Sequence, residues 1–198
     1  MLRMRRKFTI TVAGSFYLAG ALVLLIFPLN WLLAAAIAAC FHDFCHYLSL
    51  RAFHTKILSV TIKISGIYIE TELLSPGKEF ICALAGPIGG GALILLSKWL
   101  PRTALCALVY SLYNLLPVYP LDGGRALRCG ARILLPPKIA EIVCSFIEII
   151  VAALLFIVGF YGTFLRHTGI FPILFTGILL MKIYKGKLSC KPRLQKVQ

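Results

Sequence analysis

Long apolar stretches, separated by short polar segments, run along almost the whole chain. Nearly charge-free runs of about 20 residues recur, which is the length of helix needed to cross a bilayer. The first run is too long for a signal peptide and lacks a clear small-residue cleavage site, so we expect it to be retained as a span. The pattern predicts an all-α polytopic membrane protein, with residues 1–198 forming one domain. Its six predicted spans are residues 8–29, 30–50, 79–100, 103–121, 139–160 and 168–184.

One segment after the second predicted span departs from the helical pattern. In residues 57–70, Val60, Ile62 and Ile64 alternate with polar residues, and Gly66 interrupts the alternation. A period of two is typical of β-strands. We therefore expect a short membrane-associated β-hairpin, with an interfacial loop as the alternative.

Composition and charge agree with a membrane protein. The chain is 60% hydrophobic and 14% charged, whereas soluble domains are usually about 25% charged. A net charge of +14 first suggests nucleic-acid binding, but the basic residues lie between the apolar spans. With a cytoplasmic N-terminus, all but Lys98, Arg102 and Arg166 of the 21 basic residues are cytoplasmic. The positive-inside rule thus predicts that both termini are cytoplasmic, that residues 185–198 form a basic tail beside the lipid bilayer, and that no nucleic acid is bound.

Three ionisable residues lie inside the second predicted span, where a charged group costs at least ~2.5 kcal/mol. His42 and His46 are four positions apart and share one helix face, so both imidazoles can bind one zinc ion. Asp43 follows the first histidine, where an HExxH motif has its general base. A pair of histidines hydrogen-bonded between helices is the alternative. Cys45 could also face the metal, although ordinary helix packing is preferred.

A second polar motif, Asn114 to Gly124, follows at the end of the fourth predicted span. Its prolines disturb the helix, and its glycines let the backbone approach another group closely. Irregular backbone at membrane depth is tolerated only where it is buried in protein or lines a water-filled cavity. Asp122 could complete a three-ligand zinc site or could simply cap a turn. Measured from the basic residues Arg51 and Arg125, the histidines and Asp122 reach similar depths, which favours one joint site.

The two motifs together resemble the site-2 protease family of intramembrane zinc metalloproteases. The run from His42 to His46 is similar to the family's HExxH motif, and Asn114-x-x-Pro117 with Asp122-Gly123 is similar to its NxxP and DG elements. Ala85-Gly86-Pro87 resembles the family's Gly-Pro element, so the core motifs fall within residues 30–130. Six spans without a PDZ insertion resemble the compact sporulation-type branch, which processes a membrane-tethered sigma-factor precursor.

The resemblance implies a function and a site. Zn²⁺ would be bound by His42, His46 and Asp122, Asp43 would act as the general base, and Asn114 and Pro117 would border the substrate cleft. The substrate would be a membrane-embedded or membrane-tethered protein, cut near the cytoplasmic face during regulated intramembrane proteolysis. Regulatory membrane proteins would be further partners, and the bacterial cytoplasmic membrane would be the location. The predicted hairpin could pair with an unwound substrate.

Two positions differ from the family's pattern. Position 43 holds aspartate instead of glutamate, and Gly90 stands where many members have asparagine. A base must come within about 2.6 to 3.2 Å of the proton it takes, and aspartate is one methylene shorter. A catalytically weakened or inactive relative, acting as a zinc-binding scaffold or chaperone, is therefore the alternative. A metal transporter is a third interpretation, but the second span offers no ladder of ligands beyond His42, Asp43 and His46.

Overall fold

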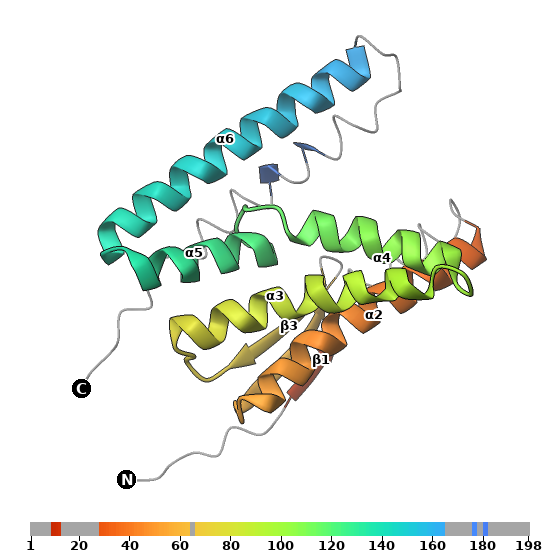
Figure 1. Cartoon of the computed structure of the whole chain (residues 1–198), viewed down its shortest axis with the longest axis horizontal. Helices are drawn as coiled ribbons and strands as arrows, with labels where there is room; N and C mark the ends of the chain where they lie inside the picture. The colour runs from red at the N-terminus through yellow and green to blue at the C-terminus, as the bar shows by residue number, and fades with distance from the viewer. Residues whose placement is uncertain (1–8, 13–27, 64–65, 165–175, 178–179, 182–198) are drawn as a thin grey trace. The chain divides into compact units, whose positions relative to one another are not determined.

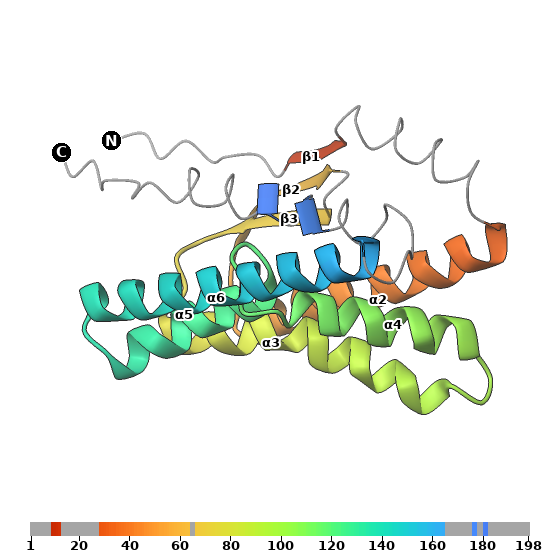
Figure 2. The ribbon, with the colours of Figure 1, turned by 90° about the horizontal axis from the view of Figure 1, so that it is seen from above.

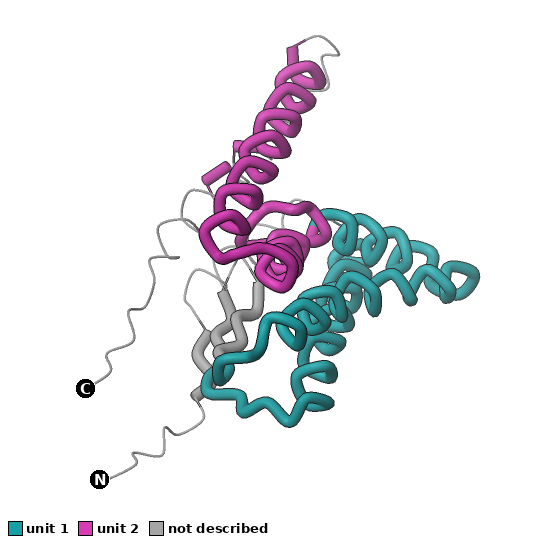
Figure 3. The backbone as a smooth tube through the Cα atoms, turned by 60° about the vertical axis from the view of Figure 1, so that its left-hand side comes forward, with its two compact units in different colours: residues 1–113 teal, residues 114–198 magenta. Residues whose placement is uncertain are grey.

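The chain is mostly helical, with one small sheet (Figure 1). This computed structural model describes residues 9–12, 28–63, 66–164, 176–177 and 180–181. The chain divides into two compact units, residues 1–113 and residues 114–198 (Figure 3). In chain order the elements are β1 (Thr9–Val12), α2 (Leu29–Ala52), β2 (Ile57–Lys63), β3 (Gly66–Thr71), α3 (Pro76–Ala92), the 3-10 helix η1 (Leu93–Leu96), α4 (Pro101–Asn114), α5 (Asp122–Leu134) and α6 (Pro137–Phe164).

Three helical segments among the described residues are long and apolar enough to cross a membrane. They are α2, α3 continued by η1, and α6. Each presents large apolar side chains on its exposed surface, such as Leu33 and Ile37 on α2. Length, composition and exposed apolar surface together support a membrane protein.

The predicted span over residues 103–121 is not one helix. Helix α4 ends at Asn114, and α5 begins only at Asp122. Pro117 and Pro120 lie between them, and neither has a backbone N–H with which to continue a helix. With 14 residues, α4 is about 21 Å long, shorter than the roughly 30 Å of a hydrocarbon core. Of the predicted span 168–184, only four residues lie in the described part.

The first predicted span is wrong at its start, because residues 9–12 form strand β1. The segment Thr-Ile-Thr-Val has only β-branched residues, which favour a strand over a helix. The rest of that predicted span, residues 13–27, lies outside the described residues.

The sheet has the strand order β1-β2-β3 (Figure 2). Strand β1 runs parallel to β2, with Thr9 opposite Ser59, and β2 runs antiparallel to β3, with Val60 opposite Ile69. Strands β2 and β3 lie in the segment where alternation predicts a hairpin. Helix α2 lies between β1 and β2 in the chain, as the connection between parallel strands.

In the first unit, α2 packs along α3. Helix α2 buries a narrow stripe in which Ala34, Ala38 and His42 follow one another at intervals of four residues. Residues at this spacing lie on one helix face, and small side chains let two helices approach closely in a membrane. The stripe brings an imidazole into the packed interior of the unit.

In the second unit, α5 packs against α6, and the two helices lie side by side in both ribbon views (Figures 1 and 2). Helix α6 also buries a stripe at four-residue intervals, formed by Ala140, Cys144 and Glu148. A carboxylate at the third position of an otherwise apolar stripe requires a partner.

Candidate metal site

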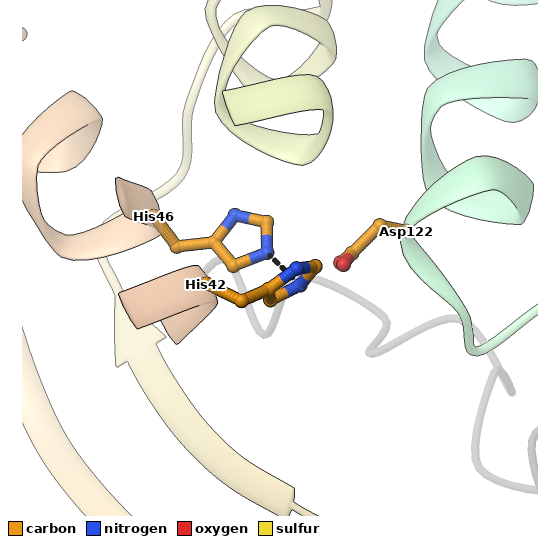
Figure 4. Close-up of side chains that lie close together, drawn as sticks. All are labelled: His42, His46 and Asp122. Carbon is orange, nitrogen blue, oxygen red and sulfur yellow. Dashed lines mark hydrogen bonds between the residues drawn. The ribbon is translucent and has the colours of Figure 1, made fainter. Parts of the chain in front are cut away.

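His42 and His46 present their imidazoles to one another from successive turns of α2. His42 is 2% exposed, and His46 is partly buried. Their Nε2 atoms lie 3.2 Å apart, and the rings meet edge to face (Figure 4). A tetrahedral zinc ion with Zn–N bonds of 2.0–2.1 Å would set two ligand nitrogens roughly 3.3 Å apart. The pair therefore fits two nitrogen ligands of one zinc ion.

A backbone carbonyl determines which nitrogen of His46 carries the proton. His46 Nδ1 lies 2.7 Å from the carbonyl oxygen of Cys82 on α3. Because a carbonyl oxygen can only accept, Nδ1 donates, and in the neutral ring Nε2 keeps its lone pair. Metal-binding histidines usually have such a hydrogen bond on the other ring nitrogen.

Gly86 on α3 leaves the space that the two imidazoles occupy. A Cβ atom at this position would overlap His46 Nε2 and would lie 2.7 Å from His42 Nε2. Every residue other than glycine would displace the rings. The glycine of the Gly-Pro element thus allows α3 to lie directly against the histidine pair.

Helix α4 covers the other side of His42. The ring of Tyr110 meets that of His42 edge to face, with centroids 4.8 Å apart. One residue further, Ser111 is buried, and within the described chain its hydroxyl has no hydrogen-bond partner. A Cβ at Gly90 would overlap Ser111 Oγ and would lie 3.5 Å from His42 Nδ1. No side chain fits at position 90, which explains why glycine stands there.

In the second unit, Asp122 is the first residue of α5, and its side chain is 12% exposed. A carboxylate in the first turn of a helix is stabilised by the helix dipole. Arg125 Nη1 lies 3.7 Å from Asp122 Oδ1 one turn later. Asp122 thus offers a mostly buried carboxylate close to a cationic side chain of its own helix.

The two glycines after Asp122 let the preceding loop fold back on the start of α5. A Cβ at Gly123 would overlap the carbonyl oxygen of Leu115 and would lie 2.6 Å from that of Leu116. A Cβ at Gly124 would overlap the peptide between Val118 and Tyr119. The Asp-Gly-Gly sequence therefore combines a ligand with two backbone contacts that position it.

His42, His46 and Asp122 each offer one ligand atom, and these atoms lie within 4.8 Å of one another. This His-His-Asp group could hold a metal ion, and its two imidazoles and one carboxylate suit zinc. Three protein ligands leave a fourth position for water, as in catalytic rather than structural zinc sites.

The other predicted site residues lie outside the His-His-Asp group. Asp43 is half-buried beside His42 but is not a member of the three-residue group. Asn114 is buried as the last residue of α4, and Pro117 is half-buried in the loop that follows. Their predicted roles, as base and as borders of the substrate cleft, stay predictions. Cys45 packs against Gly89, where a Cβ would lie 2.8 Å from Cys45 Cβ.

Sequence reasoning missed two charged residues of the second unit. Glu148 on α6 is 1% exposed and forms an ion pair of 2.9 Å with Arg128 on α5. The available signal was the presence of a carboxylate inside the apolar run of residues 139–160. Its partner could not be identified without the packing of α5 on α6.

Comparison with solved structures shows a likeness in fold. The chain is similar to the site-2 protease from Methanocaldococcus jannaschii, with a TM-score of 0.62 and 20% sequence identity. The match covers 96% of this chain and 93% of that one. At this identity the similarity concerns the fold. No protein-family model and no curated protein matches the chain.

Proposed function

We propose that this protein is an intramembrane zinc metalloprotease that hydrolyses a peptide bond of a membrane-associated or single-span protein near the cytoplasmic face. The main observation is the His42–His46 pair, whose Nε2 atoms lie 3.2 Å apart, close to the spacing of two nitrogen ligands on one zinc ion. The His-His-Asp group and the fold likeness to a site-2 protease support the same proposal. We assign the chain to the compact sporulation-type branch of that family.

Each polar residue then has one task. His42, His46 and Asp122 would hold the ion, and a bound zinc would supply an activated water and polarise the scissile carbonyl. Asp43 takes the proton of the attacking water and returns it to the leaving amine. Asn114 and Pro117 border the cleft in which the substrate lies.

The substrate is recognised as an added strand. A helical substrate must be extended before its amide can be attacked, and an exposed sheet edge can hold an extended peptide through backbone hydrogen bonds. Strand β3 is an edge of the described sheet, because only β2 pairs with it there. We therefore place the substrate beside β3, with both chain termini in the cytoplasm.

Metal analysis tests the site. The purified protein should contain about one zinc ion per chain, and His46→Asn should lose it. The exposed His54 provides a matched control, because His54→Asn makes the same chemical change outside the site and should keep the zinc. Wild type without zinc, or equal zinc in both variants, contradicts the proposal.

Cleavage is measured separately, with single-span proteins tagged at both ends and co-expressed with the protease. Wild type and His54→Asn should release the fragment, and His46→Asn should not. Zinc retained without cleavage of any substrate supports the second candidate, a zinc-binding scaffold or chaperone. The observation that favours this candidate is the aspartate at position 43.

A further inference from the structure

Glu148 is a buried carboxylate in the mostly apolar helix α6, whose other charged residues, Lys138 and Glu141, are exposed near its start. Both of its carboxylate oxygens are used by Arg128: Nε donates to Oε1 at 3.0 Å, and Nη2 donates to Oε1 at 2.9 Å and to Oε2 at 3.0 Å. The Arg128 side chain is 14% exposed. Replacing a buried ion pair by apolar residues is often neutral or stabilising, so packing α5 on α6 does not by itself require these charges.

The pair also holds a residue of the irregular loop between α4 and α5. The backbone N–H of Tyr119 donates to Glu148 Oε1 at 3.3 Å, and the Arg128 guanidinium lies 4.8 Å from the centre of the Tyr119 ring. Outside a helix, this N–H needs an acceptor from elsewhere, because an unpaired amide is costly in an apolar setting. Glu148 supplies that acceptor from α6.

The loop segment held by Glu148 leads directly into the helix that carries Asp122. The Leu121 N–H donates to the carbonyl oxygen of Val118 at 2.9 Å, and the backbone at Gly124 packs against the peptide between Val118 and Tyr119. Asp122 lies three residues after Tyr119. The position of the peptide between Val118 and Tyr119 therefore determines where α5 starts and in which direction the Asp122 side chain points.

We propose that Glu148 is a positioning residue for Asp122. Through Arg128 and the Tyr119 amide, it holds the loop so that the Asp122 carboxylate is directed toward the metal. Glu148 itself does not bind the ion. The inference rests on the proposed function, since it gives Asp122 the role of a zinc ligand.

The double variant Arg128→Met/Glu148→Leu separates positioning from packing. It removes both charges at once, so no unpaired charge stays buried, and the thermal midpoint should fall by no more than the loss of one hydrogen bond requires. The Tyr119 amide loses Glu148 as an acceptor. Zinc affinity should fall about tenfold, as for other groups that orient a ligand, and backbone hydrogen exchange in residues 115–121 should become faster.

Two controls make the outcome specific. Glu141 is exposed on the same helix, so Glu141→Leu should change neither zinc affinity nor exchange. In an Asp122→Asn background, adding the double variant should lower zinc affinity no further, because the effect acts through Asp122. A full tenfold further loss there, or wild-type affinity of the double variant itself, overturns the inference.

The hydrogen exchange measurement keeps this inference distinguishable from the proposed function. Wild type without zinc would contradict the proposed function and with it the ligand role of Asp122, whereas faster exchange of residues 115–121 in the double variant would still show that Glu148 holds the loop. Unchanged exchange would overturn the positioning role whether or not the protein binds zinc.

Discussion

His46 donates from Nδ1 to the backbone carbonyl of Cys82 across 2.7 Å. Because this bond joins two helices, the orientation of the imidazole depends on the packing of α3 against α2. The lone pair of Nε2 is directed toward His42 before any metal arrives. The first unit therefore orients two of the three candidate ligands.

Gly86→Ala should abolish most zinc binding. The added Cβ would overlap His46 Nε2 and crowd His42 Nε2, and overpacking of this kind costs about 1–3 kcal/mol. Since this cost destabilises the arrangement of the two imidazoles that binds zinc, zinc affinity should decrease roughly 5- to 150-fold. Competition with a zinc chelator measures the change.

The matched control for this variant lies on the same helix. A Cβ at Gly91 would meet no atom within 4 Å, so Gly91→Ala should bind zinc as wild type does. A similar loss of zinc affinity in both variants would mean that the effect comes from helix α3 as a whole and not from the space at Gly86.

Gly90→Ala should lower stability, and Ser111→Ala should reverse the effect. The new Cβ overlaps Ser111 Oγ and would lie 3.7 Å from Ser111 Cβ, which is ordinary contact, so removing the hydroxyl removes the clash. Ser111→Ala alone should stabilise by about 1 kcal/mol, because it deletes a buried polar group without a partner in the described chain. Thermal unfolding of the four proteins in detergent measures the coupling, and strictly additive effects would contradict it.

Gly123→Ala should reduce both zinc affinity and cleavage by about tenfold or more, as expected for displacement of a ligand. Its Cβ would overlap the Leu115 carbonyl oxygen and push the start of α5, with Asp122, away from the loop. Zinc titration of the purified variant checks this. Wild-type zinc affinity in Gly123→Ala would contradict this prediction, because it would show that the loop can move to accept the added Cβ without displacing Asp122.

Asp43→Asn should decrease cleavage by about 100-fold or more while zinc remains bound, because an amide cannot accept the proton. Asp43→Glu should keep or raise the rate, since the longer side chain extends the reach of the base. The measurement is the rate of reporter cleavage by wild type, Asp43→Asn and Asp43→Glu at equal zinc content. Equal activity of wild type and Asp43→Asn, with a gain in Asp43→Glu, would favour the scaffold.

Sequence pattern identified the candidate metal ligands more readily than the groups that orient them. His42 and His46 are recognisable because their spacing is the helix repeat and their polarity is unusual in an apolar span. The Cys82 carbonyl is a backbone group, which every residue possesses, so no residue type marks it. Glu148 was visible as a charge in a span, but its partners Arg128 and Tyr119 depend on how a loop folds.

The apolar composition of the chain also limited how well element boundaries could be predicted. Thr9 to Val12 alternates like a strand, yet these four residues merge into the apolar run that follows and are easily assigned to a span. The break after Asn114 was predictable from Pro117 and Pro120, but the return of the loop onto Gly123 and Gly124 was not. Close contact between backbones depends on tertiary packing, which local propensity does not encode.

The parallel pairing of β1 with β2 constrains the order of assembly during synthesis. Thr9 leaves the ribosome first, but its neighbour in the sheet, Ser59, follows only after the whole of α2 has been made. Strand β1 therefore cannot pair with β2 until α2 has been synthesised. The pairing joins residues that are far apart in the sequence, and such long-range contacts slow folding. The sheet can therefore be completed only after α2 has been synthesised.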